Sequence, residues 1–334
     1  MLLVAKLRRR PRHFHSFTGL SVAEFDRLLA EFQPAYETYR EQCRTATAHK
    51  RQPGAGRPGS LNLPERLLMG LIYLRLYMSQ SLIAFFFDID QSNVCRELNE
   101  RLFPVLLAVL PVPLRDAPLR SASSWEQIAD NIKKSQEDAK NKIRNKQRRI
   151  STLKELLETY PELSEVLLDA TEQSIPQPED KGERKQAYSG KQQDHTVKTQ
   201  VLATRQQILH LFGGLPGCLH DMTVLGASGV ITQIPQRIPI RLDKGYQGAD
   251  KRYPDHDIKQ PVKGNRRYKV TVLGQAYNYL LSTLRIYVEH HFARLQQFGV
   301  LRDLYRGKSE VHEDIFSIVS GLLNYRSSGK FSLV

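Results

Sequence analysis

Apolar residues recur at helical spacing near the start of the chain, which predicts a helix over residues 12–46. Ser21 followed by Glu24 has the spacing of a capping box, in which each side chain bonds the backbone N–H of the other residue. The apolar stripe that would face the core consists of Phe17, Leu20, Phe25, Leu28, Leu29 and Phe32. The pattern therefore predicts an amphipathic helical unit at the start of the chain.

Further helical segments follow a basic Gly/Pro-rich linker at residues 49–59. They are Glu65–Tyr77, Ser79–Phe87 and Gln91–Phe103, and the turn Asp88-Ile89-Asp90 separates the last two. A helix, a tight turn and a second helix within about 25 residues is the layout of a helix–turn–helix. We expect this unit at about residues 61–104.

The second helix of this unit carries polar side chains that suit DNA. Gln91, Ser92, Asn93 and Arg96 lie in its first turns, where short polar and guanidinium groups can reach base edges or phosphates. The turn lacks the glycine common in this motif, so plain packing of a helical hairpin is the alternative. In the linker, Arg57 belongs either to a DNA-lining segment or to a solvated hinge.

The segment 119–163 is predicted to be a basic, charged connector. Between Lys133 and Arg149 it carries eight basic and two acidic residues with few apolar anchors, so it cannot be a core helix. We expect an exposed helix whose cations either contact phosphates or remain solvated.

Short β-like runs separated by Gly/Pro turns begin after residue 163. They are Val166–Ala170, Thr196–Ala203, Ile208–Gly213, Ile238–Leu242 and Ile258–Val262. A long helix is predicted over Gly274–Gln297 and a packing helix over Glu313–Tyr325. Strands mixed with helices favour an α/β or α+β fold. We predict α+β, with a mixed sheet flanked by helices at residues 164–334 behind an all-α region at residues 1–118.

The charge balance favours a polyanionic partner. The 334 residues include 49 Lys and Arg against 35 Asp and Glu, a net charge of +14, while 40% apolar residues indicate a globular protein. A surplus of this size suits nucleic acid or an acidic membrane surface, and a basic protein without such a partner is the alternative.

The cysteines and the apolar segments argue against several other classes. Cys43, Cys95 and Cys218 form no CxxC pair, which excludes a zinc knuckle and a disulfide framework. The apolar stretch Leu67–Phe87 and the proline-containing run after Phe103 do not offer the roughly 20 clean residues of a membrane span. We expect a soluble, cytoplasmic protein without a membrane partner.

Acidic residues fall at the ends of two predicted strands and on the long closing helix. Asp169 ends one apolar run, Asp243 ends another, and Glu289 lies within Gly274–Gln297. Such carboxylates can hold two Mg²⁺ ions that clamp both sides of a phosphodiester. Spacing alone leaves the alternative that each acid is an ordinary cap or salt-bridge partner.

The blocks around these acids resemble the DDE-superfamily transposases of bacterial insertion sequences, in the insertion-sequence-five and Harbinger-like branch. The matching blocks are Leu168–Gln173, Tyr188–Lys191 with His195–Lys198, Leu215–Asp221, Leu242–Gly248 and Arg285–Leu295. The leader Phe14–Leu20 and the helix–turn–helix also resemble this family. The resemblance covers nearly the whole chain in the expected order.

The resemblance implies an RNase H-like fold whose catalytic, metal-binding triad is Asp169, Asp243 and Glu289. The implied reaction is Mg²⁺-dependent cleavage of DNA at transposon ends and strand transfer into target DNA, with Mn²⁺ as a possible substitute. The implied partners are terminal inverted repeats, target DNA and a second copy of the chain, without a small-molecule substrate, in the bacterial nucleoid.

Two other functions compete with this interpretation. One is a catalytically inactive, transposase-derived DNA-binding protein, and the other is a metal-dependent DNA endonuclease without strand transfer. The intact acidic trio argues against the first, and a joined DNA product would argue against the second.

Several residues near the triad have two interpretations. Arg285 lies one helical turn before Glu289 and either meets a phosphate or pairs with that carboxylate. Lys191 and Lys244 either line the same DNA-binding cleft or are solvated, and Asp221 is expected to cap a helix.

Adjacent helix residues point about 100° apart, so one packed and one exposed imidazole is expected at His290 and His291 rather than a metal pair. The family signature commonly has a lysine where this chain has Gln296 and a tyrosine where it has Ser282. Both departures concern contacts to DNA ends rather than the triad.

Overall fold

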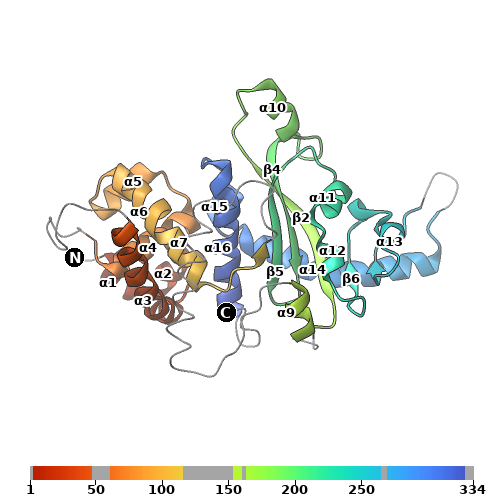
Figure 1. Cartoon of the computed structure of the whole chain (residues 1–334), viewed down its shortest axis with the longest axis horizontal. Coiled ribbons are helices and arrows are strands. Elements are labelled where there is room, and N and C mark those ends of the chain that lie inside the picture. The colour runs from red at the N-terminus through yellow and green to blue at the C-terminus, as the bar shows by residue number, and fades with distance from the viewer. Residues whose placement is uncertain (1–2, 47–60, 116–152, 160–162, 265–268, 328–334) are drawn as a thin grey trace.

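The computed structural model describes residues 3–46, 61–115, 153–159, 163–264 and 269–327 (Figure 1). Its N-terminal part is helical, and its C-terminal part is a mixed sheet flanked by helices. The predicted fold class is therefore confirmed.

The N-terminal helices are α1 (Leu3–Arg8), α2 (Pro11–Thr18), α3 (Val22–Ala46) and α4 (Leu63–Leu76). The predicted helix over 12–46 is interrupted because Gly19 takes a left-handed conformation, φ 76°, that ends α2. The expected capping box then starts α3, since the Ser21 N–H donates to Glu24 and the Glu24 N–H donates to Ser21 Oγ.

The helix–turn–helix is formed by α5 (Gln80–Phe87) and α6 (Gln91–Glu97). Asp88 ends α5 in the left-handed region at φ 51°, so it supplies the backbone conformation for which glycine was expected. The chain continues from α6 through a single π-helical stretch, η1 (Leu98–Leu102), into α7 (Phe103–Val109).

The main sheet has the strand order β1-β5-β4-β2-β6-β7. Its long members β2 (Val166–Ser174), β4 (Asp194–Ala203) and β5 (Ile208–Pro216) are antiparallel neighbours. The short strands β1 (Leu114–Arg115), β6 (Ile240–Arg241) and β7 (Ile258–Lys259) pair in parallel, and β3 (Tyr188–Ser189) pairs with β4.

The two faces of the sheet belong to different cores. On β4, Val201 and Ala203 join the core of the N-terminal helices, whereas Leu202 between them joins a second core. The second core contains residues of α9 (Leu153–Thr159), α11 (Asp221–Ser228) and α12 (Val230–Gln233). Short helices η2 (Lys244–Tyr246) and α13 (Ala249–Arg252) lie between β6 and β7 in sequence.

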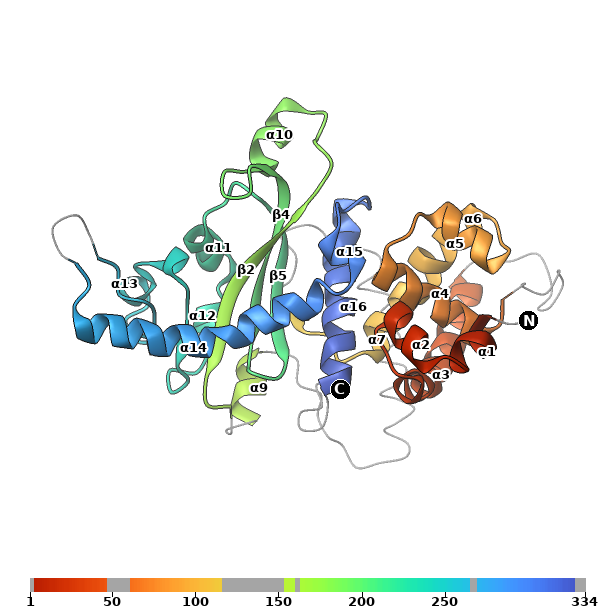
Figure 2. The same ribbon diagram turned by 180° about the vertical axis from the view of Figure 1, so that it is seen from behind.

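The C-terminal helices connect the sheet to the N-terminal part. They are α14 (Val272–Leu295), α15 (Gly299–Arg302) and α16 (Ser309–Ser327), while α10 (Lys181–Ala187) lies between β2 and β3 in sequence. In both ribbon views α16 stands between the N-terminal helices and the sheet (Figures 1 and 2). One hydrophobic core includes Phe14 of α2, Leu211 of β5 and Leu322 of α16.

One element departs from the predicted all-α region at residues 1–118. Leu114 and Arg115 form β1 and pair in parallel with His210 and Leu211 of β5. A strand of two residues that follows Pro111 and Pro113 carries no readable alternation, so the sequence could not predict it. Among the described residues, no helix is both long and apolar enough to cross a membrane.

Candidate carboxylate site and nucleic-acid interface

Two neighbouring parallel strands bring the first two carboxylates together. Leu167 of β2 pairs with Arg241 of β6, and Asp169 and Asp243 each follow two positions later. Because paired parallel strands advance in step, both acids are carried to the same end of the strand pair. Asp243 lies just after β6, as predicted, whereas Asp169 lies within β2, which continues to Ser174, so the predicted strand end at Asp169 is wrong. The two acids share a place just beyond the paired segment of β2 and β6.

The third carboxylate comes from α14, which crosses the sheet in Figure 2. Glu289 on this helix lies one turn after Arg285, whose guanidinium joins all three acids. Its Nη1 donates to Asp243 Oδ1 at 2.5 Å, and its Nη2 lies 3.3 Å from Asp169 Oδ2 and 3.1 Å from Glu289 Oε1. The structure thus brings Asp169, Asp243, Glu289 and Arg285 into one cluster.

The cluster is most buried at Asp169. The side chains of Asp169, Asp243 and Glu289 are 14%, 27% and 57% exposed, so the site opens toward α14. The pKa of Asp169 is raised to about 6, mainly by burial and to a smaller extent by the Asp243 and Glu289 charges, while the Ala170 N–H and Arg285 oppose the rise. One guanidinium charge faces three carboxylates, which leaves an excess of negative charge for further cations.

The donor chemistry of this cluster fits a hard divalent cation, because carboxylate oxygens are the ligands that Mg²⁺ prefers. The three acids are oriented toward the Arg285 guanidinium. No three acidic, His or Cys side chains in the described ranges are close enough to form a preassembled metal-binding group. Asp169, Asp243 and Glu289 can therefore supply the ligands after Arg285 moves away from them.

A buried ion cluster supports the loop that follows Asp243. Lys198 Nζ on β4 lies 3.3 Å from Glu172 Oε1 and 3.0 Å from Asp221 Oδ1, and the Lys198 and Glu172 side chains are only 6% and 5% exposed. Asp221 Oδ2 would lie 2.6 Å from a Cβ at Gly245, so glycine is required for this close approach. The cluster thus connects β2 and β4 to the turn after Asp243.

The structure gives Asp221 a different role from the expected cap. It is the first residue of α11, but its carboxylate bonds the Lys198 ammonium. Tyr246, in the turn after Asp243, is fully buried. Burial, together with the Asp169 and Asp221 charges, raises the pKa of the Tyr246 hydroxyl. Sequence reasoning missed Lys198 because its partners lie 23 and 26 positions away on other elements.

The two lysines predicted near the triad lie in different places. Lys244 is exposed and directly follows Asp243 at the start of η2. Lys191 is exposed in the turn between β3 and β4, whereas Asp169 pairs with Val201 near the far end of β4. Seven residues of strand separate Asp194 from Val201, roughly 20 Å, so Lys191 is not part of the carboxylate cluster.

The adjacent histidines behave as their helical spacing predicts. His291 is 3% exposed and its Nε2 lies 2.9 Å from the Thr204 carbonyl oxygen, while His290 is exposed. The expectation of one packed and one exposed imidazole is confirmed.

The polar residues predicted to read DNA all lie on the surface of α6. Gln91, Ser92, Asn93 and Arg96 are exposed, whereas Val94 is buried and anchors the helix. Arg96 folds along its own helix, with Nη2 donating to Asn93 Oδ1 at 3.0 Å and Nε to the Ser92 carbonyl at 3.3 Å. These side chains are available to a ligand after a change of rotamer.

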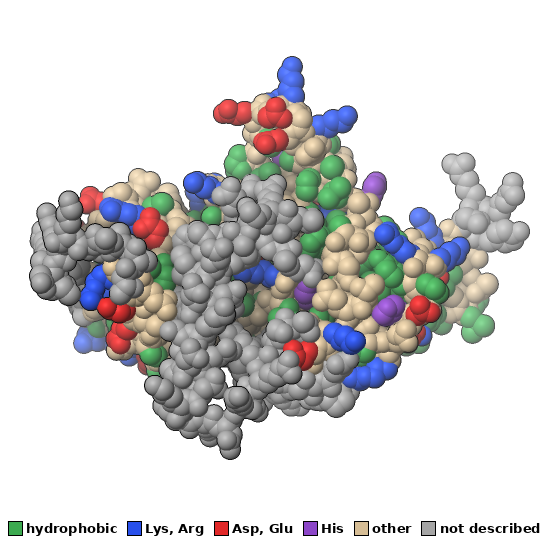
Figure 3. All heavy atoms as spheres, in the orientation of Figure 1, with side chains coloured by type: hydrophobic (Ala, Val, Ile, Leu, Met, Phe, Trp, Pro, Cys, Tyr) green, Lys and Arg blue, Asp and Glu red, His purple; other side chains and the backbone are tan. Residues whose placement is uncertain are grey.

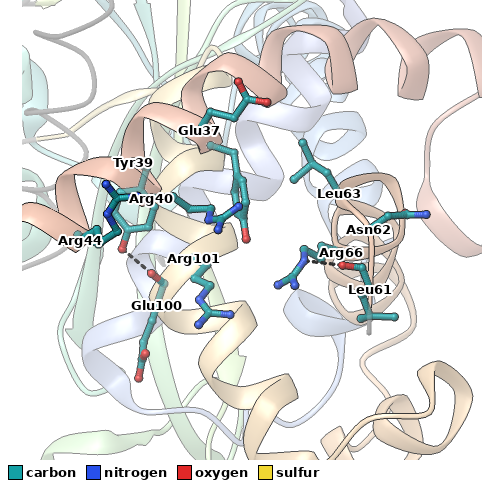
Figure 4. Close-up of a pocket in the computed structure, with 12 residues that line it drawn as sticks. Glu37, Tyr39, Arg40, Arg44, Leu61, Asn62, Leu63, Arg66, Glu100 and Arg101 are labelled. Carbon is teal, nitrogen blue, oxygen red and sulfur yellow. Dashed lines mark hydrogen bonds between the residues drawn. The ribbon is translucent and has the colours of Figure 1, made fainter. Parts of the chain in front are cut away.

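Two adjoining cavities lie near this helix, a smaller one beside α6 and a larger one beside α3. One, of about 190 Å³, is lined by Asn93, Arg96, Arg66 and Arg101, and the other, of about 780 Å³, also contains Arg66 and Arg101. The larger cavity lies between α3, the start of α4 and η1 (Figure 4).

Arginines line both sides of the larger cavity, together with the carboxylates of Glu37 and Glu100. Arg40 and Arg44 line the α3 side of the larger cavity, and Arg66 and Arg101 line its opposite side (Figure 4). Arg66 and Arg101 both bond the buried Glu97 carboxylate, which fixes them at the junction of the two cavities. Sequence reasoning missed these arginines because they come from three separate elements, α3, α4 and η1.

Other cations gather on the sheet part of the molecule. On the face in Figure 3, Lys and Arg side chains are prominent over α10 and in the region of α13. These helices contribute Lys181, Arg184 and Lys185, and Lys251 and Arg252, respectively. Arg57 and the segment from Lys133 to Arg149 lie outside the described residues.

Comparisons with known proteins match both parts of this architecture. The family model described as DDE superfamily endonuclease matches residues 168–324, and the model for the helix–turn–helix of the same superfamily matches residues 59–100. The first range contains Asp169, Asp243 and Glu289. The second contains α5, α6 and the first part of η1.

A curated relative shows the same relationship. The chain is 34% identical over 175 residues to the probable transposase for insertion sequence element IS702 of Microchaete diplosiphon. The match covers 52% of this chain, and the chain spans 60% of that relative's length. No solved structure matches the chain significantly.

The fold and site define a protein in which a helix–turn–helix precedes a mixed sheet with one acidic residue within β2 and another just after the adjacent β6. Residues 168–324 belong to the endonuclease domain of the DDE superfamily, and residues 59–100 ahead of them belong to the helix–turn–helix of the same superfamily.

Proposed function

We propose that this protein is a transposase that cleaves DNA at transposon ends and transfers the freed strand into target DNA. The observation that carries the proposal is the convergence of Asp169, Asp243 and Glu289 on one guanidinium, just beyond the paired segment of the parallel strands β2 and β6. The superfamily membership supports this assignment of the three acids as the catalytic triad.

Mg²⁺, with Mn²⁺ as a substitute, is the proposed cofactor, with two ions held by Asp169, Asp243 and Glu289. When bound, divalent cations supply Lewis-acid polarisation of the scissile phosphate and stabilise the charge that develops on its oxygens. Lys244 is positioned beside Asp243 to contact the DNA backbone, and Arg285 is proposed to contact a phosphate after it leaves the carboxylates.

DNA binding is proposed to involve both parts of the chain. Gln91, Ser92, Asn93 and Arg96 would contact the terminal repeat, and the arginines of the adjoining cavities would contact its phosphates. Arg57 in the linker and Lys191 in the β3–β4 turn are proposed as further backbone contacts.

The proposed organisation has three parts, residues 1–118, 119–163 and 164–334, and the last adopts an RNase H-like fold. The order of the principal strands, β5-β4-β2-β6-β7, supports this, because it places β2 centrally between an antiparallel and a parallel neighbour. The N-terminal and sheet parts share one hydrophobic core, which favours their acting as a unit.

The test is cleavage of DNA that carries the native flanks of the gene. The purified chain is incubated with this DNA and Mn²⁺ or Mg²⁺, and breaks and joined products are mapped. Cuts at matching inverted termini, removed by EDTA and followed by joined products, are expected. Cuts without joining would instead identify an endonuclease, and tight binding without cuts would identify an inactive DNA-binding derivative.

The matched variants are Asp243→Asn, which alters the cluster, and Asp255→Asn, which alters an exposed aspartate between α13 and β7. Asp243→Asn should abolish cleavage while end binding remains, because the amide loses the negative charge needed to hold a cation. Normal cleavage by Asp243→Asn would refute the assignment of this residue, and Asp255→Asn should cleave like the unaltered chain.

A further inference from the structure

An exposed apolar stripe runs along α14. Val272, Leu273, Tyr279, Leu280 and Ile286 are 81%, 83%, 73%, 62% and 48% exposed, respectively. They make up five of the eleven large apolar side chains that are strongly exposed in the described parts of the chain. Contiguous exposed apolar surface of this kind marks an interaction site rather than ordinary surface composition.

The spacing of these residues puts them on one side of the helix. Val272, Tyr279 and Ile286 are seven positions apart, as are Leu273 and Leu280. A seven-residue repeat keeps these side chains on one helix face, so they form one continuous stripe along α14.

The opposite side of α14 faces the protein. Leu281 and Val288 are buried, the Asn278 side chain bonds the Val262 backbone in both directions, and Arg285 bonds the three carboxylates. Figure 2 shows that α14 continues past β2 to the outer side of the sheet, where α13 lies. The stripe is therefore accessible along most of the helix.

The chemistry of the stripe does not suit nucleic acid. Between Val272 and Val288 the one charged residue is Arg285, and its guanidinium is engaged by the acids on the other side of the helix. DNA binding depends on cations that neutralise phosphates, and this face supplies none. The partner must instead present an apolar surface of similar length.

We propose that the stripe is the surface through which two copies of this chain pair, α14 against α14. The same patch on both copies gives a closed, two-fold contact, whereas pairing with a different patch would allow open-ended assembly. Burial of five such side chains from each copy removes on the order of 1,000 Å² of surface, close to the lower limit for a specific interface. The chain itself supplies a partner with the required length and repeat.

This pairing would join two carboxylate clusters through a common helix pair. Arg285 and Glu289 lie on the same helix as the stripe but on its inward side. Two paired helices would therefore hold the clusters at a separation set by the helix diameters and by the direction and register of the pair. The pairing does not depend on DNA cleavage, so its failure and the failure of the proposed reaction are separately measurable.

The first experiment is sedimentation equilibrium of the full chain over a micromolar concentration series at high salt, where repulsion between the basic copies is screened. A mass of twice 38.3 kDa is expected for the unaltered chain. The double variant Leu273→Glu with Leu280→Glu should weaken association at least tenfold, because paired helices would bury like charges. Both side chains are exposed, and a circular dichroism melt verifies that the variant is folded.

The matched control is Phe85→Glu, which alters a 79% exposed side chain in the apolar patch of α5, formed by Leu82, Phe85 and Phe86. This variant should sediment like the unaltered chain. A monomeric unaltered chain would overturn the proposal. So would a dimer that is lost in Phe85→Glu and retained in the α14 double variant.

A cross-link tests the contact directly. Tyr279 lies midway between Val272 and Ile286, so it meets its own counterpart whether the two helices run parallel or antiparallel. Tyr279→Cys, made in a chain whose exposed Cys43, Cys95 and Cys218 are replaced by serine, should form a covalent dimer on mild oxidation. Asn278→Cys, on the inward side of the helix, should not form this covalent dimer. Equal cross-linking of both variants would contradict pairing through the stripe.

Discussion

The Arg285 guanidinium donates to the Asp243 carboxylate at 2.5 Å across 42 positions of sequence. The same guanidinium reaches Asp169 and Glu289, so one side chain neutralises part of a cluster that would otherwise be strongly repulsive. Two alternatives remained for Arg285 from the sequence, a phosphate contact and an ion pair with Glu289. The structure shows the ion pair and extends it to all three acids.

Replacement of Arg285 by glutamine should destabilise the metal-free protein. Loss of a charged partner from a partly buried cluster costs about 1–3 kcal/mol, which lowers the melting temperature by several degrees. Added Mg²⁺ should raise the melting temperature of Arg285→Gln more than that of the unaltered chain, because the cation no longer competes with a guanidinium. Thermal unfolding with and without Mg²⁺ measures both effects.

The control for this prediction is Arg294→Gln, which removes an exposed arginine from the same helix. Its melting temperature and its response to Mg²⁺ should match those of the unaltered chain. An equal Mg²⁺ response in all three proteins would show that Arg285 does not compete for the carboxylates.

Much of the fold was predictable because local signals determine it. The apolar runs ending at Asp169 and Asp243 predict strands, and Ser21 with Glu24 predicts the start of α3, since these signals act within a few residues. The position of Asp243 just after a strand could be predicted for the same reason, whereas the apolar run did not show that β2 continues past Asp169 to Ser174. The sequence could not predict that Asp169 and Asp243 lie at the same level along their strands. That alignment depends on the pairing of Leu167 with Arg241, which the pattern of apolar and polar residues leaves open.

The parts of the site that the sequence did not predict depend on distant contacts. Lys198 reads as an ordinary polar residue of a strand, yet it is buried between Glu172 and Asp221. Arg66 and Arg101 lie 35 positions apart and meet because both bond Glu97. In each case, a charged residue is placed by tertiary packing, for which helical and strand periodicity carry no information.

Arg96→Ala should weaken sequence-specific DNA binding by about 1–3 kcal/mol if Arg96 reads a base. The side chain now rests on Ser92 and Asn93 and is exposed, so its loss should not affect the packing of α6. Binding to the terminal repeat and to random DNA is measured by titration at several salt concentrations. An equal loss of affinity for both DNAs, with a smaller salt dependence of binding, would identify a phosphate contact instead. The control is Arg12→Ala, at an exposed site on α2.

Lys198→Met should be strongly destabilising. Glu172 is 5% exposed, and removal of its buried cationic partner leaves an uncompensated carboxylate, at a cost of about 3–5 kcal/mol. Burial raises the pKa of the Glu172 carboxyl. Hydrogen bonds from Ser189 and Thr196, together with the Lys198 charge, outweigh this effect and hold the pKa of Glu172 below its usual value.

Urea unfolding measures the effect of Lys198→Met, with Lys191→Met, an exposed lysine of the β3–β4 turn, as the control. Adding Glu172→Gln to Lys198→Met should recover part of the lost stability, because the stranded charge is removed. No recovery in the double variant would mean that lost packing, rather than the unpaired carboxylate, causes the destabilisation.

His312 should make the protein sensitive to mild acid. Its Nε2 lies 2.8 Å from Gln173 Oε1, and Gln173 donates its own N–H groups to the Val300 and Asp303 carbonyls, so His312 must donate through Nε2. Burial lowers the pKa of His312 from 6.5 to about 4. Between pH 6.5 and about 4 the His312 imidazole binds a proton in the unfolded chain but not in the folded chain. The contribution of neutral His312 to the free energy of unfolding is therefore complete above pH 6.5 and is lost as the pH falls toward 4.

The loss attributable to His312 should reach roughly 3 kcal/mol. His312→Gln keeps a donor for Gln173 but cannot titrate, so its free energy of unfolding should fall less steeply between pH 6.5 and 4.5 than that of the unaltered chain. His290→Gln, at the exposed imidazole of α14, should leave the slope unchanged. Parallel slopes for His312→Gln and the unaltered chain would show that other groups cause the acid sensitivity.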